Sequence, residues 1–182
     1  MAETRDKAQL MSASEIDRTL VRLAHEILER TDDLSRLAFV GIQRRGLPLA
    51  QRLAKKIESL EGRQVPVGSV DIRMHRDDTA ADGRGSATGT DLSFSLTGKD
   101  VILVDDVLQT GRTVRAALDA LVEHGRAARV QLLVLIDRGH RELPIEARYV
   151  GRTVPTSRRE SIETKFQEID GAEKVMLVEE VQ

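Results

Sequence analysis

The sequence predicts a single α/β domain, with a mainly parallel central sheet and helices on both of its faces. Short, wholly apolar runs alternate with longer segments whose apolar residues recur every three to four positions, a pattern typical of such sheets. The 182 residues suit one domain spanning 1–182, and no repeat or linker divides them. Aromatic residues make up 2% of the chain, so we expect a core of Val, Leu, Ile and Ala.

The first half of the chain predicts two helices around a buried strand. Ser12 and Glu15 have the spacing of a capping box at the start of the first helix. The apolar run 37–42 predicts a fully buried strand, followed by a turn over 43–46. Pro48 then stands in the first turn of a second helix.

The second half continues the alternation after a polar loop. The loop, about residues 77–95, is rich in Gly, Ala, Ser and Thr near its start and is long enough to act as a flexible lid. A helix is predicted after residue 112. Strands are predicted at 65–72, 101–104 and 130–136, with shorter ones at 148–150 and 174–178.

Composition excludes several classes of protein. The chain has no cysteine, which rules out disulfides and thiolate metal sites and fits a reducing, cytoplasmic location. Its apolar runs are far shorter than the ~20 residues that span a bilayer, so no membrane partner is expected. A net charge of −2 argues against a uniformly basic nucleic-acid binder, although a local basic face is possible.

Residues 101–113 carry the chemistry. A hydrophobic strand leads to two adjacent carboxylates, Asp105 and Asp106, and a short loop then enters a helix. Helix N-termini bind phosphate, and residues 110–113 supply hydroxyls, a flexible glycine and a cation there. Carboxylates beside an anion site suit a ligand with vicinal hydroxyls or a cationic centre. A ribose 5-phosphate has both.

Two other readings of this segment are open from the residues alone. The acidic pair could simply cap the following helix, a task for which one Asp would suffice. The pair could also belong to a nucleoside triphosphate site, but that needs a glycine-rich phosphate loop. Gly98 and Lys99 lack the first glycine of such a loop.

Segment 101–113 resembles the 5-phosphoribosyl 1-pyrophosphate (PRPP) motif of type I phosphoribosyltransferases. Outside the 79–95 loop, nearly the whole chain is similar to one branch, the bifunctional pyrimidine operon attenuators with uracil phosphoribosyltransferase activity. The 137–145 segment favours this branch over purine or orotate enzymes. The other supporting segments are 22–26, 40–42, 45–46, 65–68, 71–72, 76–78 and 154–157.

The resemblance implies a type I phosphoribosyltransferase fold with a lid and a small hood, and it assigns roles at the site. Asp105 and Asp106 would hold the ribose hydroxyls. Pyrophosphate, carrying Mg²⁺, would lie on the turn at Arg44 and Arg45. The loop around the 5-phosphate would comprise Leu108, Gln109, Thr110, Gly111, Arg112 and Thr113, and Val107 would also bind the substrate. Arg76 and Arg84 would assist the leaving group, and the base pocket would be formed by Ile136, Arg138 and Val154.

A second hypothesis concerns RNA. The resemblance implies a homodimer or higher homo-oligomer whose basic face binds pyrimidine operon messenger RNA, with UMP adjusting the affinity. The residues concerned are Arg18, Arg22, His25, Arg30, His140, Arg141 and Arg152. Alternatively, these cations form an ordinary solvated face. Two other functions are open: a nucleotide-sensing, RNA-binding regulator without catalysis, and a phosphoribosyltransferase for another base.

Overall fold

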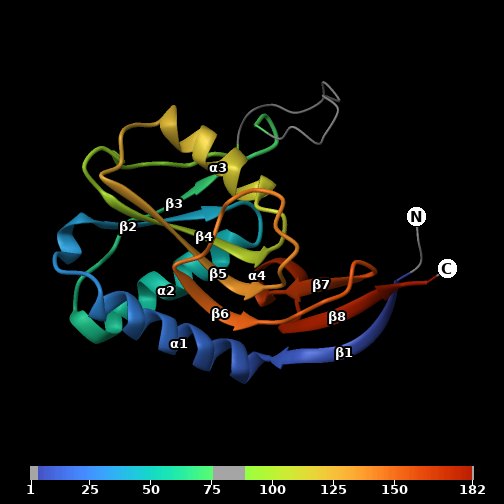
Figure 1. The fold of residues 1–182 in the computed structure, drawn as a ribbon. Helices are drawn as coiled ribbons and strands as arrows, with labels where there is room; N and C mark the ends of the chain where they lie inside the picture. Colours follow the sequence, from blue (N-terminus) through green and yellow to red (C-terminus); the bar gives the residue numbers. More distant parts are fainter. Residues whose placement is uncertain (1–3, 76–88, 182) are drawn as a thin grey trace.

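Five parallel strands form the central sheet of the computed structural model, which describes residues 4–75 and 89–181 (Figure 1). The spatial order is β3-β2-β4-β5-β6, and each neighbouring pair is parallel. The predicted parallel sheet is thus confirmed. The strands are β2 Leu37–Ile42, β3 Val67–Val70, β4 Asp100–Leu108, β5 Arg129–Asp137 and β6 Tyr149–Thr153.

Helices cover both faces of this sheet (Figure 1). Helices α1 (Ala13–Glu29) and α2 (Gly46–Glu61) pack on one face, and α3 (Arg112–Val122) packs on the other. Successive strand residues point to opposite faces. Phe39 and Ile102 therefore join the cluster under α1 and α2, whereas Val40 and Leu103 join the cluster under α3. This double burial explains why the strands read as unbroken apolar runs.

Local chemistry fixes where α1 and α2 begin. The capping box predicted for α1 is present: Glu15 N donates to Ser12 Oγ over 3.3 Å, and Ser12 N donates to Glu15 Oε2 over 2.8 Å. Helix α2 begins at Gly46, where the chain passes so close to β4 that only glycine fits. A Cβ at Gly46 would lie 2.2 Å from Val104 O.

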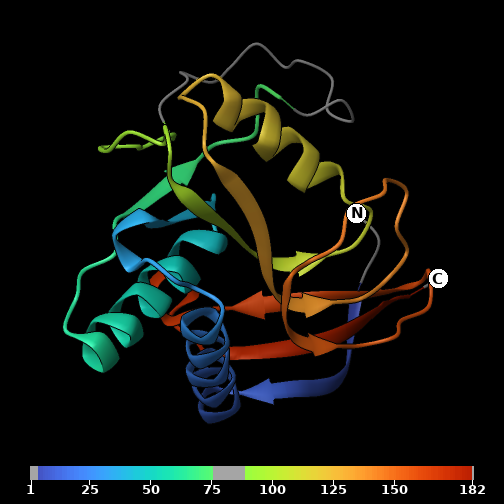
Figure 2. The same cartoon turned by 60° about the vertical axis from the view of Figure 1, so that its left-hand side comes forward.

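A second, antiparallel sheet lies beside the carboxyl ends of the parallel strands (Figures 1 and 2). Its order is β1-β8-β7, with β1 Thr4–Ser12, β8 Lys174–Glu180 and β7 Glu160–Lys165, and the short helix α4 (Gln167–Asp170) joins β7 to β8. We call residues 4–12 and 160–180 the hood. The sequence predicted only the region of β8, because β1 is mostly exposed and lacks an apolar pattern.

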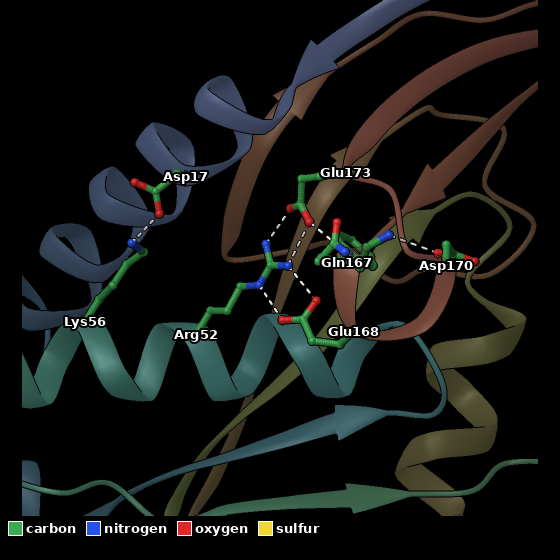
Figure 3. A network of polar contacts seen from close by, with 8 residues as sticks. Asp17, Arg52, Lys56, Gln167, Glu168, Asp170 and Glu173 are labelled. Carbon is green, nitrogen blue, oxygen red and sulfur yellow. Dashed lines mark hydrogen bonds and ion pairs between the residues drawn. The ribbon is translucent and has the colours of Figure 1, made fainter.

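Ion pairs fasten the hood to α2 (Figure 3). Arg52 donates to Glu168 Oε1 from Nε over 2.8 Å and to Glu173 Oε2 from an Nη over 2.9 Å, and it stacks over Phe166 at 5.5 Å. Planar guanidinium groups suit such paired contacts with carboxylates. The hood is therefore held against the helix that follows the 43–46 turn.

Several predicted boundaries need correction. Strand β4 does not end at 104 but runs to Leu108, because its parallel pairing with β5 continues to Asp137. Strand β3 covers 67–70 rather than 65–72. Most of the predicted lid, residues 77–88, lies outside the described residues. Its last part is packed: Asp91 pairs with Ser69, and Phe94 contacts the cluster under α3.

No described helix is long and apolar enough to cross a membrane.

Candidate active site

A cavity of about 590 Å³ opens at the carboxyl ends of β4 and β5. Its wall is made by residues 105–114 together with Arg138, Glu142, Ser161 and Ile162. The structure thus brings together Arg138 and the whole predicted segment from Asp105 to Thr113. Ser161 and Ile162 come from hood strand β7, which sequence reasoning missed.

The two adjacent carboxylates lie at this cavity and are held by backbone groups. Asp106 N donates to Asp105 Oδ1, and Val107 N donates to Asp106 Oδ1, each over 2.9 Å. The hydroxyl of Thr164 donates to the other oxygen, Asp106 Oδ2. Helix α3 has no side-chain cap at its N-terminus, so the helix-capping reading of the acidic pair is wrong.

Burial changes the acidity of the first carboxylate. Asp105 is 7% exposed, and its burial raises the pKa of its carboxyl well above the ordinary value, with the adjacent charge of Asp106 acting in the same direction. Two neighbouring carboxyls in this setting are stabilised by hydroxyl donors or a positive centre. A ribose offers both when its anomeric carbon becomes cationic.

The loop between β4 and α3 is shaped by the 137–145 segment. Gly111 ends the loop with φ 91°, a conformation that favours glycine. The backbone N–H groups of Glu142 and Leu143 both donate to Thr110 O, over 3.0 and 3.1 Å. Arg112 N donates to Thr110 Oγ1 over 3.2 Å. The loop therefore presents the start of α3 to the cavity in a fixed form, as an anion site requires.

Arg141 has an internal role. Its guanidinium donates to Gln109 O over 3.0 Å, to Ile145 O over 2.7 Å and to Asp137 Oδ2 over 2.5 Å. These contacts tie the loop after β4 to the loop after β5. The structure thus places Arg141, expected on an RNA face, behind the expected phosphate loop.

The expected pyrophosphate turn sits beside the acidic pair without lining the described cavity wall. Arg45 forms an ion pair with Asp170 of hood helix α4, with 3.0 Å between Nη2 and Oδ1. The peptide bond between Gln43 and Arg44 is cis. The close approach of Gly46 to Val104 and Asp105 holds this turn next to β4. Arg76 and Arg84 lie outside the described residues.

Of the three residues expected in the base pocket, one lines the cavity and two belong to the core or pack against it. Ile136 is fully buried in the core under α1 and α2, and Val154 packs against the same cluster. Arg138 lines the cavity, but its guanidinium donates to Thr156 Oγ1 over 3.0 Å and to the backbone carbonyls of Ser157 and Glu160. Arg138 thus also holds the segment that leads into β7.

The acidic pair also supplies oxygen donors of the kind that Mg²⁺ prefers. Mg²⁺ is commonly held by one or two carboxylates together with substrate phosphates. Asp105 and Asp106 stand beside the expected phosphate loop, so this donor set fits Mg²⁺ that arrives on a pyrophosphate. Within residues 4–75 and 89–181 no group of three or more His, Asp or Glu side chains is placed to hold a metal ion.

A second, open groove of about 430 Å³ lies over α1 and β6, where Arg18, Arg22 and Arg152 line it. Arg22 donates to Gly151 O over 2.5 Å, and Arg152 donates to Leu10 O. The structure thus gathers three of the seven residues expected to bind RNA.

The remaining residues of the expected RNA set do not line this groove. Arg30 stacks over Tyr149 at 5.4 Å, and His140 Nε2 lies 2.6 Å from Thr156 O. His25 is exposed on α1.

Comparison with known proteins places the chain in a family. Residues 9–168 match the phosphoribosyl transferase domain. The chain is 55% identical over 176 residues to the bifunctional protein PyrR of Pelotomaculum thermopropionicum, covering 96% of this chain and 97% of that protein. It is 54% identical to the bifunctional protein PyrR of Thermus aquaticus, with the same coverage.

The fold is similar to a hypoxanthine-guanine phosphoribosyltransferase from Bacillus anthracis, with a TM-score of 0.72 over 97% of this chain and 99% of that one. At 19% sequence identity this similarity shows a shared fold and nothing more. The full-length similarity to the PyrR proteins is far closer. Together with the cavity described above, it shows that this chain belongs to the phosphoribosyltransferases and, among them, to the bifunctional PyrR family.

Proposed function

We propose that this chain transfers ribose 5-phosphate from PRPP to uracil, forming UMP and pyrophosphate. The observation that carries the proposal is the placement of Asp105 and Asp106 in the same cavity as the loop that opens α3. Sugar hydroxyls and a 5-phosphate require these two kinds of group side by side. Family membership supports the same reaction.

In the proposed reaction, uracil N1 forms a bond to the anomeric carbon of PRPP while the bond from that carbon to pyrophosphate breaks. The N1 proton leaves to solvent. Asp105 and Asp106 accept the ribose hydroxyls and offset positive charge on the sugar, while residues 108–113 hold the 5-phosphate. Because these groups are positioned before the substrate binds, electrostatic preorganisation supplies most of the catalysis.

The leaving pyrophosphate needs positive charge. Arg44 and Arg45 are proposed to contact it from the turn before α2, which requires the Arg45 side chain to exchange its contact with Asp170. Arg76 and Arg84 are proposed to assist. Mg²⁺, when bound through the pyrophosphate, would neutralise part of its charge. Ile136, Arg138 and Val154 remain the proposed surroundings of the base.

The decisive assay measures UMP formation from uracil, PRPP and Mg²⁺, with hypoxanthine, guanine and orotate as parallel acceptors. Reaction with uracil alone supports the proposal. Reaction with a purine or orotate would reassign the base. If PRPP or UMP binds but no base reacts, the chain is better described as a nucleotide-sensing regulator.

A second proposed activity is regulation of pyrimidine operon expression through messenger RNA, in the cytoplasm and as a homodimer. The groove lined by Arg18, Arg22 and Arg152 favours it, because three cations converge there on an open surface. Phosphate contacts made by arginine give salt-dependent binding, with a slope of about 0.7 to 0.9 per phosphate in a plot of log affinity against log salt concentration.

The RNA proposal is tested by titrating a pyrimidine operon leader RNA at several salt concentrations, with and without UMP. Arg18→Ala should weaken binding and reduce the salt slope by roughly one contact. Arg63→Ala is a matched control, since Arg63 is exposed in the segment after α2, which does not line this groove. Affinity that does not change with salt would count against RNA binding by this face.

A further inference from the structure

Hood strand β7 reaches the ribose-binding carboxylates through a buried hydroxyl. Thr164 is 3% exposed, and its Oγ1 donates to Asp106 Oδ2. The other oxygen of this carboxylate, Oδ1, accepts the N–H of Val107 over 2.9 Å. Asp106 is therefore held at both oxygens, once by its own strand and once by the hood.

The position of Thr164 in β7 links it to the cavity. Ser161 and Ile162, three and two positions earlier in the strand, line the cavity. Thr164 stands just behind them and contacts Asp106, which lines the same cavity. Burial of a hydroxyl costs free energy unless it finds a partner, and here the partner is the carboxylate that needs orienting.

A carboxylate fixed at both oxygens has lost its rotational freedom before a ligand arrives. An ionised carboxylate has about four acceptor positions, so two bonds leave acceptor positions for the ribose hydroxyls. Catalytic groups must be held within roughly 0.5 Å of their productive geometry by neighbours that are themselves packed. Thr164 meets this description, because it is buried in the hood.

We propose that Thr164 is a positioning residue for the transferase: its hydroxyl holds Asp106 in the orientation that accepts the ribose of PRPP and so couples the hood to the sugar site. The inference rests on the proposed function, in which Asp106 binds that ribose. The competing explanation is that the hydroxyl only fastens the hood. If the hydroxyl only fastens the hood, removing it should lower stability without a selective change in PRPP binding.

The test compares Thr164→Val, which keeps the shape but removes the donor, with Thr164→Ser, which keeps the donor. Thr164→Val should raise both the Kd of Mg²⁺-PRPP, measured by calorimetry, and its KM by about 10-fold, the size expected for one bond to a charged acceptor. The KM for uracil should stay within about twofold. Thr164→Ser should keep the Kd and KM of PRPP within about twofold of the wild-type values. Glu163→Gln, at an exposed neighbouring position in β7, is the control and should do the same.

A double-mutant cycle with Asp106→Asn separates this inference from the proposed function. Once the Asp106 carboxylate is gone, adding Thr164→Val should change the Kd of PRPP by less than about twofold, because the two residues act as one unit. If wild-type protein fails to bind PRPP, or Asp106→Asn has no effect, the proposed function itself fails. If both behave as proposed while folded Thr164→Val binds PRPP like wild type, only the positioning role is overturned.

A lower melting temperature in Thr164→Val but not in Thr164→Ser, with unchanged PRPP binding in both, would show that the hydroxyl only fastens the hood. Should Thr164→Val fail to fold, Thr164→Cys replaces it, since a thiol is a weaker donor of similar size. An intermediate rise in the Kd of PRPP supports the positioning role, and a wild-type Kd refutes it.

Discussion

Gly46→Ala tests whether the close packing of α2 on β4 positions the site. The added Cβ would lie 2.2 Å from Val104 O, 3.1 Å from Val104 C and 3.3 Å from Asp105 Cα. Carbon–oxygen contacts in proteins are normally about 3.3 Å or longer, so the helix and the strand must separate by roughly 1 Å. The clashing atoms are backbone, so no side chain can rotate away.

The magnitude follows from that separation. Overpacking of this kind costs about 1–3 kcal/mol. At this chain length it corresponds to a fall in melting temperature of roughly 2–12 °C. The movement displaces the turn at Arg44 and Arg45 relative to Asp105, and a misplacement of ~1 Å at a reacting centre can cost about 100-fold in rate.

Calorimetry and the uracil phosphoribosyltransferase assay measure the two effects on the same protein. Gln51→Ala, at an exposed position of the same helix, is the control and should change neither quantity appreciably. The reasoning is refuted if Gly46→Ala melts within about 1 °C of wild type and keeps its kcat/KM within about twofold. A loss of stability without a loss of activity would separate packing from positioning.

Three further substitutions follow from the same structure. Asp106→Asn should lower turnover by roughly 100-fold or more with an unchanged melting temperature, and near-normal turnover would contradict the assigned role. Asp105→Asn should abolish activity yet raise the melting temperature at neutral pH. Because burial raises the pKa of the Asp105 carboxyl, the folded state binds this proton more strongly than the unfolded state does, so wild-type stability decreases as pH rises above about 4. The difference in melting temperature between wild type and Asp105→Asn should vanish below that pH. If a pH series of melting curves shows a constant difference instead, the raised pKa of Asp105 is not its cause. Arg52→Met should cost about 1–3 kcal/mol by releasing two hood glutamates, whereas Lys56→Met, which loses only a pair with the exposed Asp17, should cost ~0–1 kcal/mol by chemical denaturation.

Features that depend on neighbouring residues could be predicted from the sequence. The capping box of Ser12 and Glu15 is a contact over three positions, and it is present as predicted. The apolar runs predicted the parallel strands, because residues buried on both faces must all be apolar. The adjacent acids Asp105 and Asp106 and the glycine at 111 identified the family and lie together in one cavity. Their catalytic and binding roles stay predictions.

Features that depend on residues far apart in the chain could be seen only once the chain was folded. Strand β1 exists through its register with β8, where Thr4 pairs with Glu180, and no local pattern encodes a pairing across the whole chain. For the same reason the hood residues Ser161 and Thr164 could not be assigned to the site.

The cations show a second limit of sequence reasoning. Arg141 was expected on an RNA face, and its guanidinium also donates to Gln109 O in the loop after β4, while RNA binding by this residue stays a prediction. Arg22 likewise donates to the carbonyls of Val150 and Gly151 while it lines the basic groove. A guanidinium group is charged either way, and whether it meets solvent or a backbone carbonyl depends on which segments the fold brings beside it. Sequence therefore determined the chemistry available to this protein, and the tertiary structure decided which groups are left to contact a ligand.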